Sequence, residues 1–236
     1  MKVSIITAVL NSHEIVRRQI LHYEKMNLSD DVEIIFMDDG SKPPLNIKTT
    51  MKNFYVHQTN DDRAWTEHIA RNRGIELSRG EYLILIDIDY ILPREAIEAV
   101  RNFDGDRMNF KRRFGALDKT GNIVYDRKTL ESYKLKSRWF KTIYFPGHRS
   151  QFAMNKKLFL DFGKYREDLS GVNHPMGGGA GQRFWQKWMK AERKGSVVAS
   201  EIVPEIFMFP AGKFCISGGD NPLGLFHDLR RETNGS

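Results

Sequence analysis

The sequence of 236 residues contains a single cysteine, Cys215. One cysteine cannot form an intramolecular disulfide or a metal site of several thiolates, and this usage is typical of a reducing compartment. No apolar run approaches the roughly 20 residues that a bilayer-spanning helix needs, and the first residues enter a strand pattern without a long apolar signal region. We therefore expect a soluble, cytoplasmic protein with no transmembrane segment.

Three common catalytic signatures are also missing. The sequence has no complete Gly-x-Gly-x-x-Gly fingerprint and no Gly-x4-Gly-Lys-Ser/Thr loop, so the usual dinucleotide-binding and P-loop sites are excluded. It has no Gly-x-Ser-x-Gly elbow, which holds the nucleophile of α/β-hydrolases. A glycine-rich stretch at residues 177–181 precedes a predicted helix at 182–194 but completes none of these motifs.

Charge and hydrophobic content set broader limits. Lys and Arg number 37 against 30 Asp and Glu, which gives a net charge of +7. A basic surface favours an anionic partner such as a nucleotide, a nucleic acid or an acidic membrane surface, although solubility alone also accounts for it. With 40% hydrophobic and 11% aromatic residues, the chain has enough apolar surface for a globular core of enzyme size.

Strand-like and helix-like segments alternate over residues 1–103. This alternation predicts a mostly parallel, doubly wound α/β sheet flanked by helices. We take residues 1–236 as one domain, with residues 1–103 as a nucleotide-binding half and residues 104–236 as a mixed second half. The first half has expected strands at 3–7, 32–37, 54–57 and 82–86, and expected helices at 12–26, 63–78 and 93–103.

Beyond residue 103 the pattern changes. Residues 131–149 interleave basic and aromatic side chains, which can hold a phosphate backbone and stack bases. Such a segment is more often an irregular surface whose aromatic side chains belong to the core. The other expected elements are a hairpin of strands 108–114 and 123–125 around a turn at 118–122, strands at 151–154 and 197–203, and a helix at 156–162.

The most continuous apolar segment, residues 82–86, leads directly into Asp87 and Asp89. The carboxyl ends of parallel strands form the edge at which open α/β sheets bind ligands. Two acids one residue apart point the same way from an extended chain, and their oxygens suit Mg²⁺ or Mn²⁺ carrying a phosphate. The alternative is a solvated, Asp-rich turn.

Four ordered motifs resemble the family 2 glycosyltransferases of the GT-A fold. Residues 3–7 with Asn11 resemble their first strand and loop, residues 38–41 their base-recognition turn, residues 70–74 their Ala-Arg-Asn-x-Gly helix, and residues 87–89 their Asp-x-Asp motif. Beyond residue 103 the resemblance is weaker. Residues 152–156 and 163–168 resemble the segment before the family's acceptor loop, and the tail from His227 is similar to the end of related galactosyltransferases, where a histidine binds metal.

The resemblance implies a metal-dependent hexosyltransferase with a Rossmann-like GT-A domain and a mixed, acceptor-side C-terminal region. It implies a UDP-sugar donor, Mn²⁺ or Mg²⁺ bound by Asp89 and His227, and Asp87 at the ribose or a metal-bound water. The metal would neutralise the charge that develops on the leaving diphosphate. The implied partners are the nucleotide sugar and an acceptor, which is a glycan, a small molecule or a nucleic acid.

The same resemblance implies the rest of the donor site. Asp39 would accept a hydrogen bond from the base, and Arg71 would position the base or the diphosphate. Thr7 and Asn11, at the end of the first strand, would line the same site. A nucleotidyltransferase would instead carry a Gly-rich, Arg-containing loop after the first strand, and residues 8–11 are no such loop.

One departure from the family pattern concerns the base. Inverting members carry a carboxylate ahead of the helix that here begins near Gln182, where residues 179–182 read Gly-Ala-Gly-Gln. Either Glu167, Asp168 or His174 takes the acceptor proton, or the reaction retains configuration with Gln182 as a neutral stabiliser near the anomeric carbon. The third alternative is a decayed GT-A fold that transfers nothing and binds a nucleic acid or an anionic glycan.

Overall fold

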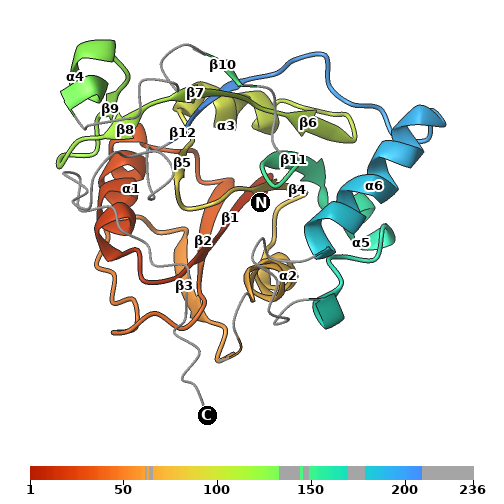
Figure 1. The fold of residues 1–236 in the computed structure, drawn as a ribbon, viewed down its shortest axis with the longest axis horizontal. Helices are drawn as coiled ribbons and strands as arrows, with labels where there is room; N and C mark the ends of the chain where they lie inside the picture. Colours follow the sequence, from red (N-terminus) through yellow and green to blue (C-terminus); the bar gives the residue numbers. More distant parts are fainter. Residues whose placement is uncertain (62, 64–65, 133–143, 146–148, 170–178, 209–236) are drawn as a thin grey trace.

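A computed structural model describes residues 1–61, 63, 66–132, 144–145, 149–169 and 179–208 (Figure 1). These residues form an α/β domain around a central sheet of six strands in the order β3-β2-β1-β4-β11-β6. No helix in the described ranges is long and apolar enough to cross a membrane.

Four strands of the central sheet are parallel and come from the first half of the chain. They are β1 (Val3–Val9), β2 (Val32–Asp38), β3 (Phe54–Gln58) and β4 (Tyr82–Leu85). The parallel register aligns Val3 with both Val32 and Tyr82, so β1, β2 and β4 end at one edge. The sheet is completed by β11 (Phe152–Asn155), antiparallel to β4, and by β6 (Arg107–Asn109), antiparallel to β11. The predicted mostly parallel α/β sheet is confirmed.

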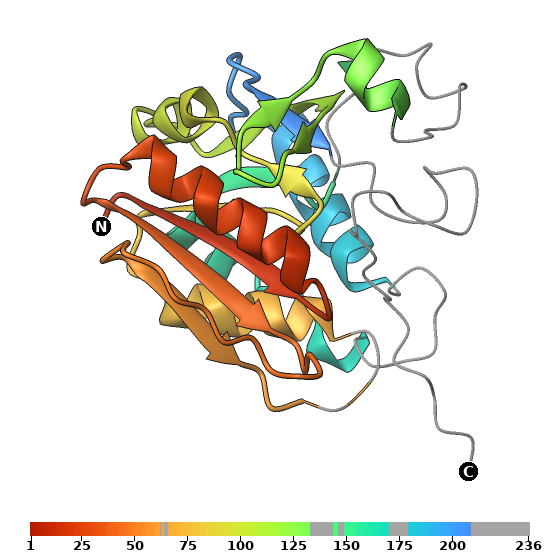
Figure 2. The same cartoon turned by 90° about the vertical axis from the view of Figure 1, so that its left-hand side faces the viewer.

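Helices cover both faces of this sheet (Figure 2). Consecutive side chains of a strand point to opposite faces, so Ile5 of β1 joins one hydrophobic cluster and Ile6 the other. The first face is covered by α1 (His13–Met26) and α3 (Arg94–Arg101), and the second by α2 (Glu67–Leu77), α5 (Lys156–Asp161) and α6 (Ala180–Arg193).

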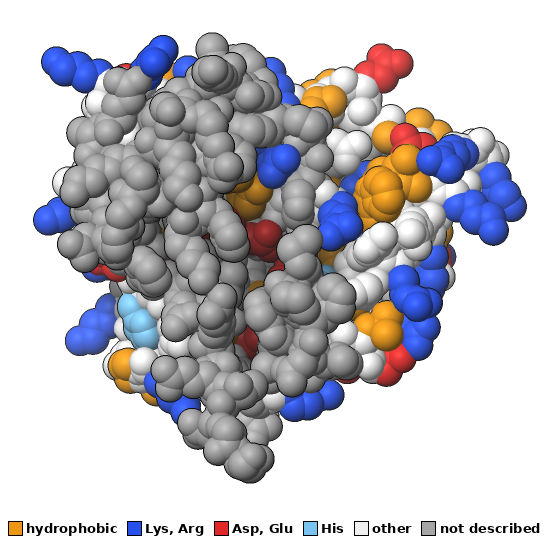
Figure 3. All heavy atoms as spheres, in the orientation of Figure 1, with side chains coloured by type: hydrophobic (Ala, Val, Ile, Leu, Met, Phe, Trp, Pro, Cys, Tyr) orange, Lys and Arg blue, Asp and Glu red, His pale blue; other side chains and the backbone are white. Residues whose placement is uncertain are grey.

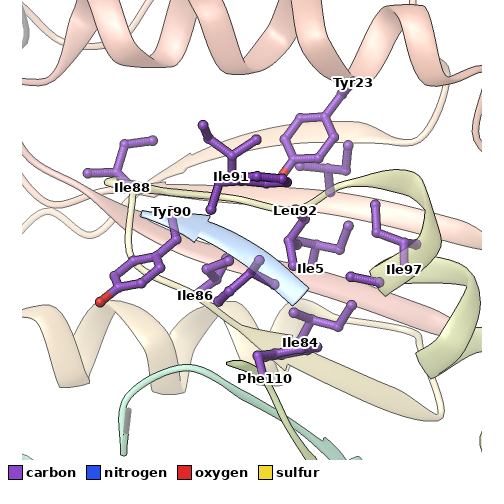
Figure 4. Packing of buried hydrophobic residues seen from close by; sticks show 14 of the residues in the cluster. Ile5, Tyr23, Ile84, Ile86, Ile88, Tyr90, Ile91, Leu92, Ile97 and Phe110 are labelled. Atoms are coloured by element: carbon purple, nitrogen blue, oxygen red, sulfur yellow. The ribbon is translucent and has the colours of Figure 1, made fainter. Parts of the chain in front are cut away.

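The core on the α1 face is built from aliphatic side chains of several elements. Figure 4 shows Tyr23 of α1 close to Ile91, while Ile5 and Ile84 of the central strands lie below Leu92. All of these side chains are at most 2% exposed. Burial of one such side chain stabilises the fold by about 1.5–3 kcal/mol, so this cluster holds α1 firmly against the sheet.

A second sheet, in the order β10-β7-β12-β5, lies beside the first. Its edge strand β5 (Tyr90–Ile91) directly follows Asp89, so the second sheet begins at the predicted metal ligand. The remaining members are β7 (Lys111–Phe114), β10 (Tyr144–Phe145) and β12 (Glu205–Met208). The short elements outside the two sheets are the β8 (Ala116–Leu117) and β9 (Ile123–Val124) pair, α4 (Arg127–Ser132) and the 3₁₀ turn η2 (Glu167–Leu169).

Two predictions for the second half are wrong in part. The turn at 118–122 does join an antiparallel pair, but the pair is β8 and β9, because residues 107–114 are divided between the two sheets as β6 and β7. The expected strand at 197–203 makes only one bridge, between Arg107 and Ala199. Val197 is buried, but Val198 and Ile202 are 65% and 64% exposed, so the run has no continuous buried face. The strand forms instead at Glu205–Met208, where Ile206 and Phe207 reach the core.

Candidate active site

The carboxyl ends of β1, β2 and β4 gather polar side chains at one edge of the sheet. Thr7 lies inside β1 and is only 2% exposed, so little of it reaches this edge. Asn11 has a left-handed backbone with φ of 49°. Its amide donates to Ser41 Oγ over 2.9 Å, and its side-chain oxygen accepts from the Lys42 amide over 2.8 Å. Asn11 therefore joins the loop after β1 to the turn after β2.

Asp38 and Asp39 of that turn have different surroundings. Asp38 is fully buried, and its carboxylate accepts from the amides of Ser41 (2.9 Å) and Leu45 (2.8 Å) and from the Gln58 side chain (2.8 Å). Burial opposes ionisation of Asp38, but these hydrogen bonds outweigh it and hold its pKa below the usual value. Asp38 therefore shapes the turn and leaves Asp39 at the edge of the sheet.

Asp39 ties the turn to the start of α2. Its carboxylate accepts from Thr59 Oγ1 over 3.0 Å and from Thr66 Oγ1 over 2.6 Å, and its amide donates to the Val9 carbonyl over 2.7 Å. At 5% exposed it is nearly buried, which fixes its orientation.

Asp87 is held by two donors from distant parts of the chain. The fully buried guanidinium of Arg71, on α2, donates to one carboxylate oxygen of Asp87 and, over 2.9 Å, to the Ser150 carbonyl. Gln151, also fully buried and adjacent to β11, donates to the other carboxylate oxygen. Glu67 Oε1 lies 3.2 Å from Arg71 Nε. Both oxygens of Asp87 are therefore occupied by protein groups.

Asp89 differs from Asp87 in its partners. Among the described residues, no side chain donates a hydrogen bond to the Asp89 carboxylate. Burial, together with the charge of Glu67, raises the pKa of Asp89 to about 7, although its own amide works in the opposite direction. Burial also raises the pKa of Asp87 well above its usual value against the attraction of Arg71, and Glu67 and Asp89 add to the rise. The edge concentrates negative charge, which Arg71 opposes at Asp87 and which Arg112 and Arg71 oppose at Asp89.

The segment that carries both acids is fixed from the α1 side as well. Gln19, at 2% exposed, donates to the carbonyl of Tyr90 over 2.7 Å and lies 3.4 Å from that of Ile88. These two carbonyls flank Asp89. The backbone around Asp89 therefore has a fixed position even though the Asp89 carboxylate has no donor from another described side chain.

The predicted base candidates lie on the far side of α2. Asn72 donates to Glu167 Oε1 over 2.9 Å and to the Tyr165 carbonyl over 2.8 Å, so the segment with Glu167 is fastened to α2. Asp168 is exposed and paired with Arg166, whose hydrogen bond lowers the pKa of Asp168. Gln182 is exposed in the first turn of α6. His174 and His227 lie outside the described residues.

The first turn of α6 lies against α2. A Cβ built on Gly181 would be 2.7 Å from Nε2 of His68, which is nearly buried at 7% exposed. His68 in turn packs edge-on against Tyr165, with ring centroids 4.8 Å apart. Gln182 and Glu167 thus approach the same end of α2 from two different segments.

The donor set at this edge fits a divalent cation in its chemistry. Asp89 offers hard carboxylate oxygens, and a bound cation would favour the charged form that burial and the charge of Glu67 disfavour. Within the described ranges, no group of three or more His, Cys, Asp or Glu residues is arranged to hold a metal. The predicted histidine ligand, His227, lies outside the described residues.

The profile of the family described as "Glycosyl transferase family 2" matches residues 4–163, more than half of the chain. This chain belongs to that family. The resemblance drawn from the four motifs is therefore confirmed at the level of the family. A curated relative, the poly(ribitol-phosphate) β-N-acetylglucosaminyltransferase TarP of Staphylococcus aureus (strain N315), is 28% identical over 106 residues, which are 43% of this chain and 32% of TarP.

Solved structures share the GT-A fold of this family 2 member. Residues 1–349 of S. aureus TarS match with a TM-score of 0.55 and 14% identity, covering 89% of this chain and 61% of that one. The same part of TarS in complex with UDP-GlcNAc matches with a TM-score of 0.53 and 15% identity, covering 94% of this chain and 60% of that one. A mannosyltransferase of Pyrobaculum calidifontis in complex with GDP-Man and Mn²⁺ matches with a TM-score of 0.54 and 14% identity, covering 87% of this chain and 56% of that one. This chain therefore spans about three fifths of the TarS fragment.

Three residues of the site were not among the predicted site residues. Gln151 lies 64 positions from its partner Asp87 and carries no motif that marks it. Asn72 and Glu67 stand on the same helix as Arg71, within or beside the Ala-Arg-Asn-x-Gly match. The sequence offered one signal for the two helical residues: they are polar side chains in a helix that packs on the sheet, and buried polar groups almost always form hydrogen bonds with specific partners.

Proposed function

We propose that this protein is a metal-dependent glycosyltransferase that moves a hexosyl group from a UDP-sugar to an acceptor hydroxyl. The observation that supports this proposal most strongly is the difference in hydrogen-bond partners between the two aspartates after β4, Asp87 and Asp89. Asp87 is held by Arg71 and Gln151, whereas Asp89 stands at the same edge without a donor from another described side chain. An arrangement with one acid fixed and one acid available suits a site that must place a single cation accurately.

The residues take separate roles in this proposal. Asp39, oriented by Thr59 and Thr66, accepts a hydrogen bond from the base of the donor. Asp89 and His227 bind Mn²⁺ or Mg²⁺, which on binding neutralises charge on the diphosphate as it leaves. Asp87 contacts the ribose or a metal-bound water through the lone pairs that Arg71 and Gln151 do not use.

Support for the donor comes from the structural neighbours. TarS has been solved with UDP and with UDP-GlcNAc, and the Pyrobaculum enzyme with GDP-Man and Mn²⁺. The motif match at residues 38–41 is to uridine users, which favours a UDP-sugar. The acceptor remains open at this level among a glycan, a small molecule and a nucleic acid.

For proton transfer from the acceptor, Glu167 is a better candidate than Asp168. Asn72 fixes the Glu167 carboxylate near α2, whereas Asp168 is neutralised by Arg166 and its lowered pKa makes it a weaker base. His174 and the retaining alternative with Gln182 stay open. The basic and aromatic segment that motivated the binding-module alternative lies mostly outside the described residues.

A thermal-shift panel tests the donor and the metal together. UDP-GlcNAc, UDP-glucose, GDP-mannose and free UDP are each added with Mn²⁺, with Mg²⁺ and with excess chelator. A ligand present at a hundredfold over its Kd adds about 2.7 kcal/mol to the stability of the folded state. We expect a uridine ligand to raise the Tm with either metal and to have little effect in chelator.

A matched pair of variants gives the control. Asp89→Asn keeps the shape of the side chain but loses the anionic ligand, so the metal-dependent shift should disappear. Asp30→Asn makes the same change at an exposed aspartate far from the edge and should leave the shift intact. Equal stabilisation by UDP in chelator would remove the metal from the proposal, and the absence of any shift with all four nucleotides would reject donor binding.

A further inference from the structure

His68 stands on α2 among the residues that organise the candidate site. It lies three positions before Arg71 and four before Asn72, so its side chain adjoins both of theirs on the helix surface. Arg71 holds Asp87 at the donor edge, and Asn72 holds Glu167. Figure 3, in the orientation of Figure 1, shows acidic side chains in red near the centre of this face, above the position of α2 and to the left of α6.

The imidazole of His68 fills the space that a side chain at position 181 would take. A Cβ built on Gly181 would lie 2.7 Å from Nε2 of His68, a distance at which one of the two atoms would have to move. Gly181 belongs to the first turn of α6, and the preceding Gly179 and Ala180 carry no more than a methyl group. Residues 179–181 therefore bring no functional group to α2, whereas His68 brings a nitrogen to this contact.

The surroundings of His68 favour the neutral imidazole. The side chain is 7% exposed, and its ring packs edge-on against Tyr165 with centroids 4.8 Å apart. Burial lowers the pKa of His68; the charge of Glu67 opposes this, and the charges of Arg71 and Arg149 add to it. Among the described residues, none forms a hydrogen bond with either ring nitrogen. Near pH 7 the ring therefore has a lone pair that can accept a proton.

The carboxylates near α2 are engaged with partners in the protein. The pairs are Glu67 with Arg71, Glu167 with Asn72 and Asp168 with Arg166. A cation or donor beside a carboxylate stabilises its charged form and so lowers its basicity. His68 has no such partner in the described ranges, and the general base of the reaction works best with a pKa near the operating pH. His68 is therefore better suited to accept a proton than these three acids.

From these observations we propose that Nε2 of His68 is the general base that takes the proton of the acceptor hydroxyl. In this step the hydroxyl oxygen forms a bond to the anomeric carbon. The bond from that carbon to the diphosphate breaks, and UDP leaves with the electron pair. The proton passes to Nε2, and the imidazolium later releases it to solvent. A direct displacement of this kind inverts the anomeric configuration.

The inference rests on the proposed function, because it requires a UDP-sugar and a hydroxyl acceptor. It also explains how a chain that reads Gly-Ala-Gly-Gln at residues 179–182 can activate an acceptor without a carboxylate in that stretch. The nitrogen comes from α2 instead and occupies the space in front of Gly181.

Transfer to methanol tests this assignment without knowledge of the natural acceptor. UDP-glucose and UDP-GlcNAc are each incubated with the protein and Mn²⁺ in buffer that contains methanol. The release of UDP gives kcat, and NMR of the methyl glycoside gives the anomeric configuration. His68→Gln removes the base and keeps a polar side chain of similar size. The matched control His57→Gln makes the same change at a partly exposed position on the edge strand β3.

We expect His68→Gln to lower kcat by about 10²–10⁴-fold, which is the usual contribution of a general base. The thermal shift produced by UDP and Mn²⁺ should stay at the wild-type value, because the base does not bind the nucleotide. The control should remain within about twofold of wild type in both measurements. The product of the wild type should be the methyl β-glycoside, since both donors are α-linked.

A second set of variants tests whether the base can be moved across the contact. His68→Ala removes the imidazole and vacates the space in front of Gly181. Adding Gly181→Asp on this background places a carboxylate there, at a helical position that accepts any side chain without backbone strain. We expect the double variant to have at least tenfold higher kcat than His68→Ala. Gly181→Leu on the same background fills the space without a base and should restore nothing.

The pH dependence of kcat separates a base from a residue that only packs. The charged or titratable neighbours of the imidazole are Glu67 and Arg71 on α2, Arg149, and Tyr165, whose pKa burial raises to about 12, while α6 contributes the uncharged Gly181. In saturating Mn²⁺, log kcat of the wild type should fall as the pH drops through the pKa of His68, below its usual value of 6.5. His68→Ala/Gly181→Asp should move this fall to the lower pH range of a carboxyl group.

Several results would overturn the assignment. Equal kcat in His68→Gln and the control would remove His68 from the chemical step, and a large loss in Glu167→Gln alone would give the role to Glu167. Equal rescue by leucine and aspartate at position 181 would show that His68 only fills space. A methyl α-glycoside would contradict direct displacement. A wild type that binds UDP but releases none from either donor would contradict the proposed transfer itself, so the two proposals fail in distinguishable ways.

Discussion

Replacing Asp89 by asparagine should stabilise the metal-free protein at alkaline pH. Burial and the charge of Glu67 raise the pKa of Asp89 to about 7 from an unperturbed value of 3.8. A carboxyl whose pKa is raised by folding costs no stability below its unfolded pKa. The cost grows between about pH 4 and pH 7 and is complete above pH 7. Asparagine has the same shape and no charge, so it removes this cost.

The magnitude follows from the size of the shift. One pKa unit corresponds to 1.36 kcal/mol, so a rise of about three units sets an upper bound of about 4 kcal/mol. Asp89 is partly exposed, and solvent screening reduces this bound to about 2 kcal/mol. At pH 8.5 we expect Asp89→Asn to be more stable than wild type by about this amount. At pH 5.5 roughly half of the gain should remain.

Urea unfolding in excess chelator at both pH values measures the effect, with Asp30→Asn as an exposed control expected within about 0.5 kcal/mol of wild type. Adding Mn²⁺ should reverse the order at pH 8.5, because the metal stabilises a protein that binds it and not one that lost its ligand. A gain of equal size at both pH values, or no gain at pH 8.5, would refute the raised pKa of Asp89 as the origin of the effect.

Variants at two positions, Gly74 and Arg107, test the packing of the domain. Gly74→Ala should lower the free energy of unfolding by about 1–2 kcal/mol, because the new Cβ would lie 2.7 Å from Ile6 Cγ2 and 3.0 Å from Met37 Cγ. The better helix propensity of alanine offsets only part of this cost. Urea midpoints measure the change, and a stabilised variant would contradict close packing of α2 against the sheet. Arg107 is 1% exposed, lies over the rings of Trp188 (3.2 Å) and Phe152 (4.6 Å), and burial lowers its pKa to about 9. In the same assay, the free energy of unfolding of Arg107→Met should stay within about 1 kcal/mol of wild type, whereas Arg107→Ala should lose about 2–4 kcal/mol. Equal losses in the two variants would show that the positive charge, and not the volume of the side chain, holds the rings.

The parts of the fold that the sequence predicts well are those in which local pattern and burial agree. β1, β2 and β4 are mostly apolar, buried strands of a parallel sheet, so their residues alone indicate both the strands and the edge where Asp39, Asp87 and Asp89 gather. The alternation of strands and helices predicts that these strands are parallel. The same signals located the helices on both faces.

The second half was harder because its strands are short and their partners distant. β5, β8, β9 and β10 have two residues each, too few for any periodic pattern to register. Gln151 reaches Asp87 only because β11 enters the sheet antiparallel to β4, which no local signal indicates. At 197–203 the apolar pattern predicts a strand, but Val197 alone is buried, Val198 and Ile202 are exposed, and these residues make a single bridge.

Helix α2 explains how such distant residues form one site. Thr66, at its N-cap, holds Asp39; Arg71 holds Asp87; and Asn72 holds the segment of Glu167. The positions lie at i, i+5 and i+6, so their side chains leave the helix in different directions. All three are buried, and each polar group has a partner that offsets the cost of burial.

Because every one of these contacts originates on α2, the distance from α2 to the sheet sets the geometry of the donor edge and of the acceptor side together. Gly74 fixes that distance by allowing the helix to approach Ile6 of β1. A side chain at position 74 that moves α2 outward should therefore disturb Asp39, Asp87 and Glu167 at once, and weaken donor binding and turnover in parallel. A change confined to one of the three contacts would instead separate these two properties.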